Sequence, residues 1–113
     1  MGRRRALFVR QGDTVPGGRR WADAADAAEH HFRVQLAKRV NELIAEHGVT
    51  QTRIAMMLDI AQPHVSELTN YKLDRFTSAR LLRFLTLLDR DIDIVIRRKG
   101  RGRMTGLIRV HLT

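Results

Sequence analysis

The sequence lacks cysteine and contains few aromatic residues. Without cysteine the chain cannot form disulfide bonds, thiolate zinc sites or a cysteine nucleophile. It also lacks a run of about eighteen apolar residues, the length that a membrane-spanning helix needs, so we expect no membrane span. The apolar stretch Ala6 to Val9 is too short for the core of a secretory signal. We therefore expect a cytoplasmic protein, and its 113 residues suffice for one domain with a modest core.

Patterns that would support catalysis are also missing. His30 and His31 are neighbours, so on a helix their side chains diverge by about 100° and do not easily share a metal ion. The other histidines are scattered along the chain, and no pairing of a nucleophile with a base stands out. Gly100 and Gly102 lie between two strand-like patterns rather than before a helix, so they do not form a phosphate-binding loop. The sequence predicts a protein that is not an enzyme and that holds no metal ion or cofactor.

The net charge of +9 is unevenly distributed along the chain. Residues 1–20 contain six arginines and one aspartate, and residues 91–113 contain six basic and two acidic residues. Residues 21–90 contain nine basic and nine acidic residues, so this central part is neutral. Cationic flanks suit a polyanionic partner, because each lysine or arginine near a phosphate releases counterions. The alternative is that the two ends serve only to keep the chain in solution.

The stretch from Thr50 to Tyr71 has the pattern of two short helices joined by a tight turn. Thr50 is a suitable N-cap, because its hydroxyl can accept a hydrogen bond from an unpaired amide of the first turn. The first helix is interrupted at Asp59, and the second begins at Gln62. Pro63 supports this boundary, because proline lacks an amide proton and fits only the first turn of a helix.

The apolar residues of this stretch have the spacing of a helix-turn-helix. Counted from Gln51, they occupy the fourth, fifth, eighth, tenth, fifteenth and eighteenth positions. The fifth is small, so the second helix can cross closely above it. Two short helices at that steep angle leave the outer face of the second free to enter a DNA major groove. The six residues are Ile54, Ala55, Leu58, Ile60, Val65 and Leu68.

Further helices are expected on both sides of this motif. The first spans residues 24–47, with Asp23 as its N-cap. Gly48 is its C-cap, because glycine enters the left-handed conformation without penalty. Residues 70–76 form a polar loop, and Thr77 caps a helix over residues 78–88. The inward residues expected of these helices are Leu36, Ala37, Val40, Leu43, Ile44 and His47, then Leu81, Leu82, Leu85 and Leu88, with Phe84 and Leu87 beside them.

The periodicity changes after residue 90. Ile92, Ile94 and Ile96 alternate with other residues as in a strand, and residues 107–112 alternate again after a basic turn at 99–103. An isolated hairpin is marginal in water. It would gain by packing on the helices or by pairing with the same strands of a second subunit. We predict a dimer on this ground, and because helix-turn-helix proteins usually bind two half-sites related by protein symmetry.

These patterns together predict a mainly α fold. We expect a four- to five-helix domain with a helix-turn-helix and a short C-terminal β-strand or hairpin. Residues 1–20 are expected to be a flexible basic arm that reaches around a duplex or holds a protein partner. Residues 21–90 form the DNA-binding domain, and residues 91–113 form the strand or hairpin, a candidate dimerisation element.

Several of these segments resemble the Xre/Cro-type family, and within it the HigA-like antitoxins of type II toxin–antitoxin modules. Thr50 and Gln51 open the motif as in that group, and IAQPHVSEL follows at residues 60–68. DRFTSARLLRFLTLLDRDIDIVIR at residues 74–97 is similar to the group's fourth helix and the short strand after it. WADAADAAEHHFRVQLAKRVNELI resembles its first helix, so the likeness covers residues 21–98.

The resemblance implies a function that composition does not show. Such antitoxins bind their operator as dimers, repress their own operon and neutralise a co-encoded RelE/HigB-like mRNA-cleaving toxin. This chain departs from the group's pattern at three positions. A glycine is common where Asp59 stands, a serine or threonine where Ala61 stands, and an arginine where Glu67 stands.

The residues expected to contact DNA fall into two groups. Those on the outer face of the second motif helix suit base edges in the major groove, because glutamine can pair with adenine and glutamate can accept from cytosine. Those flanking the groove suit phosphate oxygens. The first group is Gln62, Pro63, His64, Ser66 and Glu67, and the second is Gln51, Arg53, Asn70, Lys72 and Arg75.

Two alternatives to the antitoxin remain open. The first is a stand-alone transcriptional repressor of the same fold, without a toxin. The second is a helical protein-interaction or RNA-interaction module in which the helix-turn-helix serves only as a scaffold. If the protein binds every nucleic acid weakly, and the affinity depends on salt but not on sequence, the second alternative is favoured.

Overall fold

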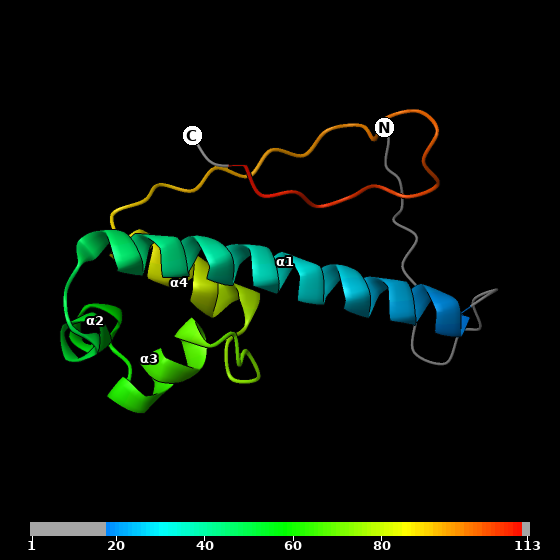
Figure 1. Cartoon of the computed structure of the whole chain (residues 1–113). Helices are drawn as coiled ribbons and strands as arrows, with labels where there is room; N and C mark the ends of the chain where they lie inside the picture. Colours follow the sequence, from blue (N-terminus) through cyan, green and yellow to red (C-terminus); the bar gives the residue numbers. More distant parts are fainter. Residues whose placement is uncertain (1–17, 112–113) are drawn as a thin grey trace.

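A computed structural model describes residues 18–111 of the chain, and helices account for most of this part up to residue 87. The helices are α1 (Gly18–His47), α2 (Gln51–Leu58), α3 (Gln62–Thr69) and α4 (Ser78–Leu87). Figure 1 shows α1 as a long rod with the shorter helices gathered beside its C-terminal half. The mainly helical fold and the two helices of the motif are thus confirmed. Among the described residues, no helix is both long and apolar enough to span a membrane.

Helix α1 begins earlier than the sequence analysis expected. It starts at Gly18, so the assignment of Asp23 as the N-cap is wrong, because this residue lies inside the helix. The physical reason is the alanine-rich segment around Asp23, since alanine has the highest helix propensity and lets the helix extend past an aspartate. Residues 1–17 of the expected basic arm, including the apolar stretch Ala6 to Val9, lie outside the described residues.

One hydrophobic core holds the four helices together. Helix α1 packs against α3 and α4, and α2 packs against α3 and α4. Within residues 26–111 no polar or charged residue is buried as a whole, so apolar side chains make up the core. Most of the expected inward residues are buried, whereas Ile44, Leu82 and Leu87 are half-buried and His47 is exposed. The core consists of Leu36, Ala37, Val40, Leu43, Ile54, Ala55, Leu58, Val65, Leu68, Leu73, Phe76, Leu81, Phe84, Leu85 and Leu88.

Each helix is followed by a residue with a left-handed backbone. Gly48 follows α1 with φ +64°, as predicted, but Asp59, Tyr71 and Asp89 adopt φ +59°, +58° and +65° without being glycine. After α2 the amide of Ile60 donates to the carbonyl of Ala55 at 3.0 Å, and the amide of Asp59 donates to the carbonyl of Met56 at 3.3 Å. This pair of bonds is the Schellman motif, which satisfies the last carbonyls of a helix and stops it sharply.

The predicted C-terminal strand is not formed. Residues 90–111 contain no strand among the described residues, and nearly all of them are exposed. Figure 1 shows this segment, in orange and red, passing α1 on the side away from α2 and α3. It is tied to α1 where the amide of Val110 donates to Oε1 of Gln35 at 3.0 Å. Alternating side chains define two faces, but a strand also needs a hydrogen-bonded neighbour, and this segment has no such neighbour within the described chain.

The left-handed turn at Asp59 leads to a prediction about stability. Asp59→Gly should raise the free energy of unfolding by about 0.5 kcal/mol, and Asp59→Val should lower it by about 1–2 kcal/mol, because a branched side chain is strained at positive φ. Urea denaturation followed by circular dichroism measures both changes. The matched control is Asp74→Gly, since Asp74 is also exposed but has no left-handed backbone. Equal destabilisation by the two glycine variants would contradict this account of the turn.

Candidate nucleic-acid interface

The α2–turn–α3 unit is held together by apolar side chains at the predicted spacing. Ile54 and Leu58 of α2 are buried with Val65 and Leu68 of α3. Ala55 is 7% exposed and has only a methyl group, so the two helices can approach closely at this position. Because the inward residues of α3 are fixed in the core, the opposite side of this eight-residue helix faces solvent.

The outer face of α3 contains the residues that were expected to read bases. Gln62 and Pro63 are exposed, and His64, Ser66 and Glu67 are half-buried. Pro63 lies in the first turn, as predicted. Ala61 is the N-cap and forms no side-chain cap, in agreement with its lack of a hydroxyl.

A pair of glutamines connects the beginnings of the two helices. Nε2 of Gln62 donates to Oε1 of Gln51 at 2.9 Å, although the residues are eleven positions apart. Gln51 is the first residue of α2, whose N-cap is Thr50, and the hydroxyl of Thr50 accepts from the amide of Arg53 at 3.2 Å. The pair orients the exposed amide of Gln62 while its remaining donor and acceptor groups stay free for an external partner.

An ion pair joins α3 to the loop that follows it. Nε of Arg75 donates to Oε1 of Glu67 at 2.6 Å, across eight residues of sequence. The hydrogen bond from Arg75 is the main cause that lowers the pKa of Glu67, with further lowering by the charges of Arg75, His64 and Lys72 and an opposing effect of desolvation. The same bond raises the pKa of Arg75. Since the carboxyl pKa is depressed, the pair is intact above the ordinary glutamate range and is lost only when the pH falls below it.

The loop that carries Arg75 is itself held by Arg80 of α4. Nη1 of Arg80 donates to the carbonyl of Arg75 at 2.8 Å. The guanidinium of Arg80 also lies 5.2 Å from the ring centre of Phe76 and 5.6 Å from that of Phe84. These cation–π contacts keep Arg80 in place, so the backbone of Arg75 is fixed at this point.

The other residues expected at phosphates differ in whether their side chains form contacts within the protein. Nδ2 of Asn70 donates to the carbonyl of Ser66 at 2.9 Å, so this side chain helps to finish α3. Arg53 and Lys72 are exposed on either side of α3, before and after it in sequence. The structure therefore brings Gln51 and Gln62 together, and Glu67 and Arg75 together, and it uses Asn70 within the motif.

Two residues of α1 that position α3 were missed in the sequence. Nη1 of Arg33 donates to the carbonyls of Leu73 and Phe76 at 2.8 and 3.2 Å, and Nδ2 of Asn41 donates to the carbonyl of Leu68 at 3.1 Å. Both side chains therefore hold the C-terminal end of α3 and the loop beyond it. Their only sequence signal is a polar residue at the border of the apolar stripe, which does not identify the carbonyl that it will meet.

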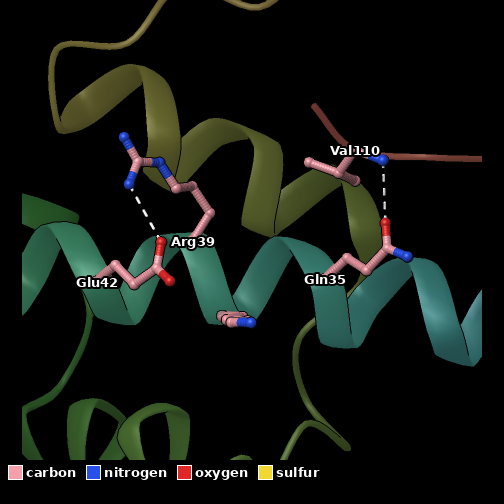
Figure 2. A pocket seen from close by; sticks show the side chains of 5 residues that line it. Gln35, Arg39, Glu42 and Val110 are labelled. Atoms are coloured by element: carbon pink, nitrogen blue, oxygen red, sulfur yellow. Dashed lines mark hydrogen bonds and ion pairs between the residues drawn. The ribbon is translucent and has the colours of Figure 1, made fainter. Parts of the chain in front are cut away.

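A small pocket lies elsewhere, where the C-terminal segment crosses α1. It has a volume of about 180 Å³ and is lined by Gln35, Lys38, Arg39, Glu42 and Val110. Figure 2 shows that the Gln35–Val110 hydrogen bond joins its two sides, whereas Arg39 and Glu42 pair with each other within α1. Ligand sites usually measure about 300–1,000 Å³, so this is a packing groove between two segments. Within residues 26–111 no cluster of histidine and acidic side chains is arranged to hold a metal ion.

The exposed face of α3 can therefore form directed hydrogen bonds and charge contacts. Amide, imidazole, hydroxyl and carboxylate groups along one turn-and-a-half of helix match the donors and acceptors that bases present in a major groove. The basic residues beside the helix match the phosphates that border such a groove.

Comparisons with known proteins agree with this geometry. A family model described as a helix-turn-helix domain matches residues 21–97. A solved structure named "Putative XRE Family Transcriptional Regulator" is 41% identical, with a TM-score of 0.74, and the match covers 78% of this chain and 99% of that one. No curated protein matches the chain.

The family match extends over well more than half of the chain and includes α2 and α3 completely. Together with the XRE-type structure, it assigns the motif to DNA-binding transcriptional regulation rather than to an enzyme. The chain thus belongs to the Xre-type helix-turn-helix family of DNA-binding transcriptional regulators.

Proposed function

We propose that this protein is a sequence-specific repressor that binds an operator, including that of its own operon, as a homodimer. The observation that carries the proposal is the Gln51–Gln62 hydrogen bond, which holds an exposed amide at the N-terminal end of α3. A side chain held in one orientation costs little entropy when it binds, so it discriminates among bases better than a freely rotating one.

The base-reading surface in this proposal is the outer face of α3. The amide of Gln62 pairs with adenine, and Pro63 contacts a thymine methyl group. Glu67 accepts from the amino group of cytosine, while His64 and Ser66 supply further polar contacts. Val65 and Leu68 lie in the core and read no base.

The phosphate-binding surface surrounds α3. Gln51, Arg53 and Lys72 are exposed where the duplex backbone would pass, and Asn70 ends the helix beside them. Arg75 leaves Glu67 for a phosphate when DNA binds, which frees the carboxylate for a base. The cationic flanks of the chain add attraction that does not depend on sequence.

We further propose that the protein neutralises a RelE/HigB-like toxin encoded beside it. Support for this part is the resemblance of residues 21–98 to HigA-like antitoxins, including Phe76 and Thr77 at the start of α4. A stand-alone repressor with the same DNA-binding face is the alternative.

The role of Gln62 can be tested by substitution. Gln62→Ala should cost about 1–3 kcal/mol in binding to the operator and little in binding to a scrambled duplex, because a base contact carries sequence information. Fluorescence anisotropy at roughly physiological salt, with the DNA upstream of the gene, measures both affinities. Gln51→Ala is the matched control. Its loss of operator affinity should be smaller than that of Gln62→Ala, because Gln62 still reaches the base but is held less firmly. Equal losses on both duplexes for Gln62→Ala would refute the assignment of α3.

The exchange of Arg75 from Glu67 to phosphate makes a second prediction. Arg75→Ala should weaken binding to operator and scrambled DNA by similar factors and reduce the salt slope by about one, because one phosphate contact is lost. Glu67→Gln should strengthen binding to the scrambled duplex more than binding to the operator, since the repulsion of the carboxylate is offset only at the operator, where a cytosine amino group contacts it. Arg83→Ala, an exposed arginine on α4, is the charge-matched control. An unchanged salt slope for Arg75→Ala would mean that Arg75 stays with Glu67 in the complex.

The antitoxin role is tested by co-expression with a neighbouring RelE-like reading frame. We expect the protein to restore growth that the toxin arrests, and Gln62→Ala to restore it equally well, because Gln62 serves DNA contact. Colony counts after induction provide the measurement. A neighbour whose toxicity the wild-type protein leaves unchanged would favour the stand-alone repressor.

A further inference from the structure

We propose that residues 91–99 pair in an antiparallel manner with the same residues of a second copy of this chain, with the two Val95 residues opposite each other. The inference rests on the dimer of the proposed function and assigns it a contact surface and a register. The surface lies within the extended segment that follows α4.

This segment has the side chains of a strand but no strand partner. Ile94, Val95 and Ile96 are 76%, 72% and 92% exposed, a large apolar exposure on consecutive residues. Branched residues of this kind favour a strand, and an unpaired strand presents a row of free amides and carbonyls that accepts another strand. The segment is therefore suited to pairing with an external chain.

The sequence of the segment, DIDIVIRRK, is complementary in charge to its own reverse. In the proposed register, Asp93 lies opposite Arg97 and Asp91 lies opposite Lys99. Twofold symmetry repeats each pair, so all four acidic groups of the two paired segments face basic ones. Directly opposed charges of unlike sign stabilise a strand pair, and charges of like sign destabilise it.

The two faces of the paired strands are also distinct. Ile94 lies opposite Ile96 on one face, and at each end of this apolar centre Ile92 lies opposite Arg98. The charged pairs lie on the other face with Val95 at the centre, because successive side chains alternate across a strand. A parallel arrangement in register would place Asp91 and Asp93 beside the same residues of the second copy, and each basic residue beside its own copy. Like charges would then be adjacent, which destabilises the pair.

Pairing within one chain is less favourable than pairing between two copies. The second strand-like run, residues 107–112, contains no acidic residue, so it cannot neutralise Arg97 and Lys99. A second copy supplies Asp91 and Asp93 at the right spacing. The same reasoning selects a copy of this chain over an unrelated partner, because the complementarity is contained in the segment itself.

The proposed contact leaves the DNA-binding face accessible. The segment passes α1 on the side away from α2 and α3, as Figure 1 shows. A second copy that binds there would not cover Gln62 or Glu67, so dimerisation and operator binding can occur together.

The experiment uses charge reversal of two full-length variants, Asp93→Arg and Arg97→Asp. Each variant alone places like charges opposite each other twice, so each should dimerise about tenfold to a hundredfold more weakly than the wild type. An equimolar mixture of the two should recover dimers, because each variant then faces its opposite. Sedimentation velocity over a range of concentrations measures the dimer fraction, and a heavier, isotope-labelled copy of one variant identifies the heterodimer by native mass spectrometry.

Controls separate register, folding and DNA binding. All of residues 91–99 are exposed, so circular dichroism should show unchanged helix content in both variants. Arg83→Asp on α4 repeats the charge change of Arg97→Asp and should leave the dimer unaffected. The variants should still bind a single half-site in a manner that depends on Gln62, which tests the proposed function independently.

Recovery only in the mixture supports the proposed register. Single variants that remain as dimeric as the wild type, or a mixture no more dimeric than the separate variants, would overturn it. A monomeric wild-type protein would also overturn it, while dependence of half-site binding on Gln62 would leave the DNA-binding assignment in place.

Discussion

Burial of Val65 and Leu68 is the contact on which the recognition surface depends. Helix α3 has only eight residues, and a helix of that length is not stable alone in water. Its existence therefore comes from the core, where both side chains are fully enclosed by α1 and α2. Because two inward residues fix both the position and the rotation of a short helix, they also determine which residues face outward. The chemistry of the outer face can then vary without loss of the fold.

Polar contacts complete what the apolar core begins. Arg33 and Asn41 reach from α1 to backbone carbonyls at the end of α3 and in the following loop. The carbonyls of Leu68 and Leu73 also accept from the amides of Tyr71 and Phe76, so each donor from α1 adds a second hydrogen bond that fixes this part of the backbone in space. Arg80 holds the carbonyl of Arg75 in the same loop. The backbone of the candidate interface is thus tied at several points, whereas the side chains of Gln62, Arg53 and Lys72 remain exposed.

The sequence predicted local features better than long-range polar contacts. Thr50 and Thr77 cap helices as expected, because a cap depends on neighbours within three residues. The Asp23 cap failed because the alanines of residues 22–28, which favour a helix, outweighed a local signal. The expected strand after residue 90 failed because a strand depends on a partner that periodicity cannot specify. The Glu67–Arg75 pair could not be foreseen, since it crosses an irregular loop with no fixed spacing. Whether the expected DNA contacts form stays a prediction.

The distribution of charge separates attraction from recognition in the proposed complex. The basic flanks attract any duplex, whereas the central part of the chain is neutral. A carboxylate at Glu67 repels phosphate, so it weakens binding wherever no cytosine amino group is available to it. Arg75 neutralises that carboxylate in the free protein. If Arg75 moves to a phosphate, the repulsion reappears at incorrect sites and is offset at correct ones. An acidic residue in a DNA-reading helix therefore increases the difference in affinity between sites, even though it lowers the affinity for most of them.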